Sequence, residues 1–470
     1  MKNQETTTHL KINNISVIGL GKLGASMAAS FAHRGFNVIG VDVNALSVTA
    51  LNEGRAPVIE TGLEDMIFNN RSRLRATLDY EKAIQDSEIS FIIVPTPSDE
   101  RGAFSLEYAQ RAFSELGKAL RKKNEYHVIV MTSTVLPGSM RAVLIPLLEH
   151  ESGLLCGRDF GVCYNPEFIA LGSVIRDFLN PDFYLLGEFD DKSGDFLESV
   201  HHRVSQNNAR VKRMSLENAE LAKIAVNSYV TMKISFANML ADFCEKIPGG
   251  DVDTVSDALG LDSRIGRKYL TGGPAFAGPC FPRDNAALAF IGEYLDVDVS
   301  LPSTNDFYNR KRAVNIFTRL KTTLPAHGVV SILGLSYKPL SHITELSSGV
   351  TLSNLFADAG YRVKAHDYMA ASIARSELNA NVILTDEIDL ALEDADIVLV
   401  VTDDKPYRAL SVGQLGADNR EVFLVDFWRI LAGLSGKKNL TYVPIGRCLD
   451  DSLAMAKMKC LWLENASDFQ

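Results

Sequence analysis

The fold is decided by residues 15–24, ISVIGLGKLG, in which a short apolar run leads directly into a cluster of glycines. The apolar run predicts a buried strand over residues 15–19, and the residues after it predict a helix over 23–34. A second apolar segment, NVIGVDV at residues 37–43, predicts another strand. Strand, helix and strand with short connections form a βαβ unit, so we expect a parallel, doubly wound sheet with right-handed crossovers.

Three glycines of this turn, Gly19, Gly21 and Gly24, have the spacing of a dinucleotide-binding loop. The first permits a tight turn, the second lets the backbone approach a pyrophosphate, and the third lets the helix pack on the strand. Asp42 ends the second strand, where a carboxylate can bind ribose hydroxyls and would repel a 2′-phosphate. We therefore predict NAD, rather than NADP, bound by this loop (with Leu23) and by Asp42. The alternative is an ordinary glycine-rich turn beside a surface aspartate.

Two further strands end in loops rich in Thr, Ser and Pro. The segments are ISFIIVPTP at residues 89–97 and HVIVMTSTV at residues 127–135. Parallel strands end at one edge of the sheet, which is where open α/β folds bind their ligands. We expect this edge to add cofactor contacts from Pro95, Thr96, Ser133 and Thr134.

A long segment at residues 215–246 has no Pro or Gly, and its apolar residues recur at three- and four-residue spacing. This pattern predicts one amphipathic helix of about 45 Å, long enough to join two domains and to form a dimer face. Two shorter helices with a kink are the alternative. Lys223 and Asn227 lie four residues apart and share one face. Together they could hold a water or stabilise an oxyanion, although such a pair is also common on solvated helices.

Cys280 stands in a glycine- and proline-rich stretch, residues 272–284, which fits neither a packed helix nor a packed strand. A thiolate there is a candidate nucleophile. The remaining cysteines are better interpreted as small buried apolar residues. These are Cys156, Cys163, Cys244, Cys448 and Cys460.

The strand and helix alternation resumes after Arg310, and the segment ALEDADIVLVV resembles AIQDSEISFIIV of the first part. We expect a second doubly wound sheet. Its first turn, at residues 334–336, lacks the complete glycine pattern, so this sheet should bind something other than a second dinucleotide.

Composition narrows the class of protein. The chain has 470 residues, of which 46% are hydrophobic and 23% charged, as in a folded protein of about three domains. Its net charge of −10 argues against nucleic acid or an anionic membrane as the main partner. Six cysteines without a CxxC pair indicate neither a zinc site nor a disulfide framework. Without a signal peptide or a long apolar run, a reduced cytoplasmic location is expected.

An ordered set of motifs resembles the UDP-glucose/GDP-mannose dehydrogenase family from Ile15 to about Arg429. In chain order the motifs are GLGKLG, VPTP, STVLPG, NPEF, ELAKIAVN, SRIG, GPCFPRD and LSYKP. The resemblance implies an NAD-binding Rossmann domain over residues 1–210 and a central helical dimerisation region over 211–312. A Rossmann-like nucleotide-sugar domain would cover 313–470. It also implies a homodimer or a higher homo-oligomer.

The family's reaction oxidises the C6 alcohol of a nucleotide sugar, most simply a UDP-hexose or a UDP-N-acetylhexosamine, twice to a carboxylate. The matching positions imply that Cys280 forms a thiohemiacetal and then a thioester. Asp284 and Thr134 would place the hydrolytic water, Glu167 would be the base, and Lys223 and Asn227 would steady the oxyanions. Implied substrate-binding residues are Phe168, Lys223, Asn227, Arg264, Tyr269, Gly278, Tyr337, Lys338 and Arg429, with Arg264 reaching the substrate of a neighbouring subunit.

Three positions depart from the family pattern: Leu171, where a second Glu is common; Glu345, in place of an Arg; and Ala277, in place of a glycine. They put the choice of sugar in doubt. A β-hydroxyacid dehydrogenase is the nearest rival, but it would need neither Cys280 nor a third α/β domain. A non-catalytic NAD-binding protein is the other alternative.

Overall fold

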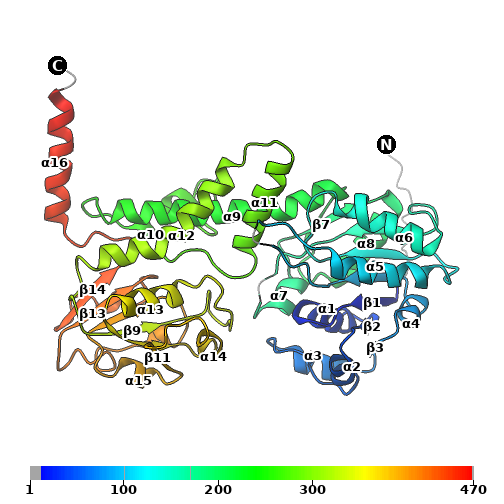
Figure 1. Ribbon diagram of the computed structural model, residues 1–470, viewed down its shortest axis with the longest axis horizontal. Coiled ribbons are helices and arrows are strands. Elements are labelled where there is room, and N and C mark those ends of the chain that lie inside the picture. Colours follow the sequence, from blue (N-terminus) through cyan, green and yellow to red (C-terminus); the bar gives the residue numbers. More distant parts are fainter. Residues whose placement is uncertain (1–11, 100, 170, 468–470) are drawn as a thin grey trace. The chain divides into compact units, whose positions relative to one another are not determined.

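The computed structural model describes residues 12–99, 101–169 and 171–467. They form two compact units (Figure 1). The first contains the described residues up to Val226 together with Glu293–Leu295, and the second contains Asn227–Gly292 and the residues from Asp296 onward.

The first unit is built on an eight-stranded sheet with the order β3-β2-β1-β4-β5-β6-β7-β8. All neighbouring strands are parallel except β6 and β7, which are antiparallel. The strands are β1 (Asn14–Ile18), β2 (Asn37–Val41), β3 (Leu74–Thr77), β4 (Ile89–Ile92), β5 (Val128–Met131), β6 (Gly161–Tyr164), β7 (Phe183–Glu188) and β8 (Arg210–Ser215).

Helices cover both faces of this sheet, because its central strands are apolar on both sides. One core contains residues of α1, α3, α7 and α8, and the other contains residues of α4, α5 and α6. The helices are α1 (Lys22–His33), α2 (Ala45–Asn52), α3 (Leu63–Asn70), α4 (Tyr80–Gln85), α5 (Glu107–Leu120), η1 (Met140–Leu144), α6 (Ile145–Ser152), α7 (Val174–Leu179) and α8 (Asp191–Val204).

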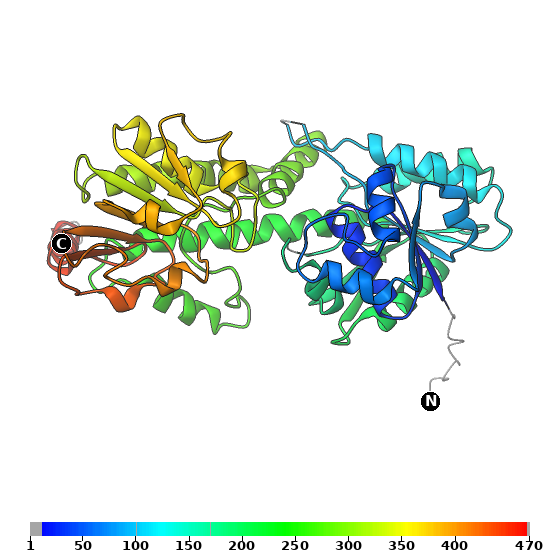
Figure 2. The ribbon, with the colours of Figure 1, turned by 90° about the horizontal axis from the view of Figure 1, so that it is seen from below.

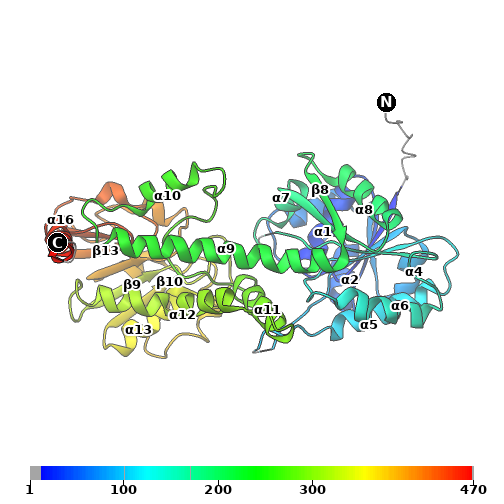
Figure 3. The ribbon, with the colours of Figure 1, turned by 90° about the horizontal axis from the view of Figure 1, so that it is seen from above.

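The long segment forms one uninterrupted helix, α9 (Leu216–Cys244), rather than two shorter helices (Figure 3). Its first part belongs to the first unit, where Leu216 and Ala219 enter the core. The rest belongs to the second unit, where Ala241 and Cys244 pack with Val252.

The second unit contains a six-stranded parallel sheet with the order β11-β10-β9-β12-β13-β14 (Figure 2). Its strands are β9 (Val329–Leu333), β10 (Arg362–His366), β11 (Ile383–Thr385), β12 (Ile397–Val400), β13 (Val422–Asp426) and β14 (Leu440–Pro444). Its helices are α10 (Val252–Gly260), α11 (Phe281–Tyr294, whose last residues belong to the first unit), α12 (Ser300–Leu320), α13 (Ser348–Asp358), α14 (Ala371–Ala374), α15 (Ile388–Leu392), η2 (Tyr407–Ala409), η3 (Ala432–Leu434) and α16 (Asp451–Ser467).

The predicted repeat of architecture is confirmed, since the second sheet has the same strand order as the first six strands of the first sheet. The close contact between the first helix and the turn before it is also the same in the two units. A Cβ on Gly24 would lie 1.9 Å from the carbonyl oxygen of Gly19, and a Cβ on Gly349 would lie 1.9 Å from that of Gly334. The two units differ in the connection between the first strand and the helix that follows it. The connection from β9 to α13 is much longer than the connection from β1 to α1. None of the helices in the described ranges is both long and apolar enough to cross a membrane.

Candidate active site

The glycine loop of the first unit has the geometry that the sequence predicted. Gly19 has φ +99°, and a Cβ there would lie 2.0 Å from the carbonyl oxygen of Ile93. Only glycine therefore permits the turn between β1 and α1. Gly21 is the N-cap of α1 and faces open space. The free amides at the start of α1 are thus accessible to phosphate, as a dinucleotide-binding loop requires.

Asp42 follows β2 and lies against this loop. Its Oδ2 accepts a hydrogen bond of 2.6 Å from the Leu20 amide, and its Oδ1 accepts one of 2.8 Å from the Asn44 amide. The carboxylate is therefore held beside the glycine loop, where a 2′-phosphate would meet negative charge. Leu23 is half-buried in the first turn of α1.

The loops after β4 and β5 are joined by side-chain hydrogen bonds. The Ser133 hydroxyl accepts from the Val94 amide at 2.9 Å and donates to the Val94 carbonyl at 2.6 Å. The Thr96 hydroxyl donates to the Thr134 carbonyl at 2.8 Å. These bonds bring together the predicted residues of two loops, with Pro95 exposed between Val94 and Thr96.

Glu220 has a role that the sequence did not reveal. Its carboxylate is fully buried and accepts from the Gly138 amide at 2.6 Å and from the Met140 amide at 2.9 Å. The negative charge thus lies at the start of η1, next to the loop that carries Thr134. Burial raises the pKa of Glu220 to about 7, although both amide hydrogen bonds lower it. The sequence signal was its position on the face of α9 that also carries Lys223.

Glu167 and Lys223 lie close together in the first unit. The Lys223 ammonium donates to the Glu167 backbone carbonyl at 2.8 Å and lies 4.6 Å from the centre of the Phe168 ring. Glu167 Oε1 is buried and has no hydrogen-bond partner in the described part of the chain. Burial raises the pKa of Glu167 to about 8, while the charge of Lys223 lowers it. A carboxyl group with such a pKa can accept a proton near neutral pH.

Cys280 is exposed and directly precedes the first residue of α11. A helix N-terminus favours the negatively charged thiolate over the thiol. The loop before it is held by Gly278, whose amide donates to the Glu345 carbonyl at 2.9 Å. Gly278 has φ +83°, and a Cβ there would lie 2.6 Å from the ring of Tyr337. Burial, with a smaller contribution from the nearby Cys280, raises the pKa of Tyr337 to about 12, so its hydroxyl remains protonated.

Asp284 is fully buried in the first turn of α11, and its carboxylate has partners at both oxygens. Asn227 donates to Oδ2 at 2.6 Å, and the Arg283 guanidinium donates to Oδ1 at 3.1 and 3.2 Å. The Asp284 amide also donates to the Cys280 carbonyl at 2.9 Å. Two predicted residues and Cys280 therefore belong to one cluster. Arg283 also belongs to this cluster; it lies in the GPCFPRD motif, but the sequence did not predict its contact with Asp284.

The remaining predicted residues lie in the second unit. Tyr269 is half exposed and packs edge-to-face on Phe281, next to Cys280. The Lys338 ammonium lies 5.7 Å from the centre of the Tyr337 ring.

Two predicted arginines differ sharply in environment. The Arg264 side chain is 86% exposed and pairs with Asp262, whereas Arg429 is buried. The Arg429 guanidinium binds Asp253 through two nitrogens and donates to the carbonyls of Gly272, Phe427 and Ile445. Substrate-binding roles for both arginines stay predictions.

A glycine loop with an adjacent carboxylate, on a sheet of Rossmann order, defines a dinucleotide-binding protein that favours NAD over NADP. Comparison with known proteins identifies its family. The chain belongs to the UDP-glucose/GDP-mannose dehydrogenase family, whose NAD binding domain matches residues 13–205, whose central domain matches 217–311 and whose UDP binding domain matches 331–433.

Individual relatives cover most of the chain. A GDP-mannose 6-dehydrogenase of Pseudomonas putida is 34% identical over 88% of this chain and 96% of its own length. A UDP-glucose 6-dehydrogenase of Haloferax volcanii is 33% identical over 90% of this chain and 98% of its own. The solved UDP-glucose dehydrogenase of Pyrobaculum islandicum is 31% identical, covers 93% of this chain and 98% of its own, and superposes with a TM-score of 0.82.

Proposed function

We propose that this chain is an NAD-dependent nucleotide-sugar 6-dehydrogenase that oxidises the C6 alcohol of its substrate to a carboxylate through a thioester on Cys280. The observation that carries the proposal is the cluster in which Cys280 begins α11 while Asp284, one turn later, is held by Asn227 and Arg283. An isolated structural cysteine would need no such surroundings.

The chemistry accounts for the kinds of residue present. NAD, when bound, accepts the hydride in each of the two oxidations. An aldehyde must become tetrahedral before it can lose a second hydride, and the Cys280 thiolate achieves this by adding to the carbonyl carbon. Loss of the second hydride leaves a thioester on the sulfur. Water then attacks the thioester, the carbon–sulfur bond breaks, and the carboxylate and the thiol are released.

The other predicted site residues also have roles in this proposal. Glu167, with its raised pKa, is the base that takes a proton from the attacking water. Thr134 and Asp284 orient that water. Lys223 and Asn227 supply a positive charge and an amide donor to the developing oxyanions. Glu220 keeps the Thr134 loop in place through two backbone amides.

The substrate is a nucleoside-diphosphate sugar bound largely by the second unit. The match to a UDP binding domain supports a UDP-sugar, whereas several relatives bear the name GDP-mannose 6-dehydrogenase. We assign its binding to Phe168, Lys223, Asn227, Arg264, Tyr269, Gly278, Tyr337, Lys338 and Arg429. We also propose a cytoplasmic location and three functional regions, at 1–210, 211–312 and 313–470.

A homodimer packed through α9 completes the proposal. Several apolar residues of this helix are exposed in the single chain: Leu221, Tyr229, Phe236, Met239 and Phe243. Exposed apolar side chains gathered on one helix are typical of a surface that a second subunit covers. Analytical ultracentrifugation at micromolar concentration should give a dimer or a larger species, and a monomer alone would contradict this part.

The function is tested by supplying UDP- and GDP-sugars with NAD and counting the NADH formed for each sugar consumed. The proposal requires a ratio of two and a uronate product. A ratio of one would instead support a β-hydroxyacid type of dehydrogenase, and no NADH from any sugar would support a non-catalytic NAD-binding protein.

A further inference from the structure

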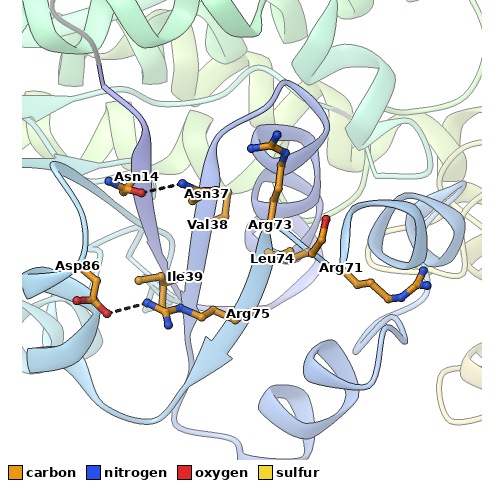
Figure 4. Close-up of a pocket in the computed structure, with 10 residues that line it drawn as sticks. Asn14, Asn37, Val38, Ile39, Arg71, Arg73, Leu74, Arg75 and Asp86 are labelled. Atoms are coloured by element: carbon orange, nitrogen blue, oxygen red, sulfur yellow. Dashed lines mark hydrogen bonds and ion pairs between the residues drawn. The ribbon is translucent and has the colours of Figure 1, made fainter.

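The first unit contains a pocket of about 320 Å³ at the amino-terminal edge of its sheet, where β1, β2 and β3 begin (Figure 4). Asn14 and Asn37, the first residues of β1 and β2, form part of its wall. The glycine loop follows the opposite end of β1, about 16 Å away at the rise of a five-residue strand. The pocket is therefore separate from the dinucleotide loop.

Three arginines line this pocket, at alternate positions of the segment Arg71-Ser72-Arg73-Leu74-Arg75. Asp86 is the only acidic residue among the lining residues, and it pairs with Arg75 at 2.7 Å. Arg71 donates to the Phe68 carbonyl at 2.7 Å and stacks on the Phe68 ring. The lining thus carries three positive charges against one negative charge.

More positive charge lies directly behind Arg73. The Gly35 carbonyl accepts from Arg73 at 3.4 Å and from Arg203 at 2.6 Å, so two guanidinium groups share one neutral oxygen. Arg34 also belongs to this group, since it donates to the Arg203 carbonyl at 3.0 Å. Burial lowers the pKa of Arg203, and the charges of Arg73 and Arg34 lower it further.

Within the described residues, these arginines are held by backbone carbonyls and aromatic rings and not by carboxylates; Arg203, for example, donates to the Ile12, Arg34 and Gly35 carbonyls and stacks on the Phe36 ring. Arg34, Arg71, Arg73 and Arg203 form no ion pair within the described part of the chain, although the whole chain carries a net charge of −10. Two acidic side chains that contact residues of the pocket wall are already engaged. Asp86 binds Arg75, and Glu88 accepts from the amides of Asn13 and Asn14. Unneutralised guanidinium groups repel one another, and an anion placed between them would relieve that repulsion.

We propose that this pocket is a binding site for a small phosphate-bearing anion, with Arg73 as its principal ligand and Arg71 at its rim. Guanidinium groups bind phosphate through two parallel hydrogen bonds, which is why arginine predominates in such sites. The side chains of Asn14 and Asn37 add polar groups to the wall. The volume suits a pyrophosphate group or a phosphorylated sugar and is at the lower limit for small-molecule sites. Free pyrophosphate and an organic phosphate ester share this chemistry.

Isothermal titration calorimetry on the full-length protein tests the site. Saturating NADH and UDP are present throughout, so that the glycine loop and the nucleotide site are blocked. Pyrophosphate and glucose 1-phosphate are the two probes. Tighter binding of pyrophosphate would identify free pyrophosphate as the ligand, and tighter binding of glucose 1-phosphate would identify an organic phosphate ester. Arg73→Gln should weaken binding of the tighter probe at least tenfold, and Arg71→Gln should weaken it less. Arg111→Gln is the matched control, because this exposed arginine on α5 is paired with Glu107 and lies outside the pocket.

The dissociation constant of the probe should also depend on salt concentration, because salt screens the attraction between the arginines and the anion. Loss of Arg73 should make the dissociation constant of the probe less sensitive to ionic strength, since fewer charges then contribute. Circular dichroism and NAD turnover should be unchanged in Arg73→Gln, which separates loss of the site from loss of the fold. If Arg73→Gln unfolds, Arg71→Gln decides the question by the same measurement. Equal binding by the wild type and both variants, or no binding of either probe, would overturn the proposal.

Discussion

The raised pKa of Glu167 predicts how the last chemical step depends on pH. The carboxyl group is the proposed base for thioester hydrolysis, and a base acts only when it is deprotonated. Burial raises its pKa to about 8 against the opposing effect of Lys223. About one tenth of Glu167 is therefore ionised at pH 7 and about nine tenths at pH 9. The rate of hydrolysis should rise about tenfold over this interval and then level off.

Measurement of this step requires that it be separated from the two hydride transfers. Enzyme, NAD and substrate are mixed rapidly and quenched in acid, and the adduct on the peptide that contains Cys280 is followed by mass spectrometry. Glu167→Gln should accumulate the adduct and show no rise in hydrolysis rate with pH. A wild-type rate that is constant between pH 7 and 9 would refute the assignment of the base, as would a Glu167→Gln variant that hydrolyses the adduct normally.

Three further predictions concern Cys280, Asp42 and Glu220. Cys280→Ser should retain substrate binding but lose about 10³-fold or more in turnover, equivalent to about 4 kcal/mol, because a hydroxyl is little ionised near neutral pH. Cys163→Ser is the control, and near-normal turnover by Cys280→Ser would rule out the thioester. NAD should be strongly preferred to NADP in steady-state kinetics. Asp42→Asn keeps an acceptor for the Leu20 amide but removes the charge, so the ratio of kcat/KM with NAD to kcat/KM with NADP should fall about tenfold. An unchanged ratio would contradict the role of Asp42. Glu220→Ala leaves two amides without their acceptor and should lower the free energy of unfolding in urea by about 2 kcal/mol, whereas the more exposed Glu217→Ala should have little effect. Because the folded pKa of Glu220 is raised to about 7, its ionisation makes wild-type stability fall as the pH rises from about 4.5 to about 7, and Glu220→Ala should lack this slope.

Local features of the fold were predictable from the sequence because their causes are local. The turn at Gly19 requires a positive φ and close backbone contact, both of which follow from residue type, and β1, α1 and β2 appear within a few residues of their predicted limits. The continuous apolar spacing of α9 likewise determined one long helix. The resemblance between the two strand segments correctly predicted a second doubly wound sheet, and the structure adds that its strand order is that of the first six strands of the first sheet.

Long-range contacts were beyond the sequence, because burial and hydrogen-bond partners arise only when distant segments meet. The antiparallel pairing of β6 with β7 has no local signature in either strand. Glu220 contacts amides some 80 residues earlier in the chain, and Asn227 meets Asp284 across 57 residues. The sequence supplied the residue types of a thioester-forming dehydrogenase. Only the tertiary structure decided that the Glu167 carboxyl group is buried and that its pKa is raised to about 8, since this pKa depends on the surroundings of the side chain.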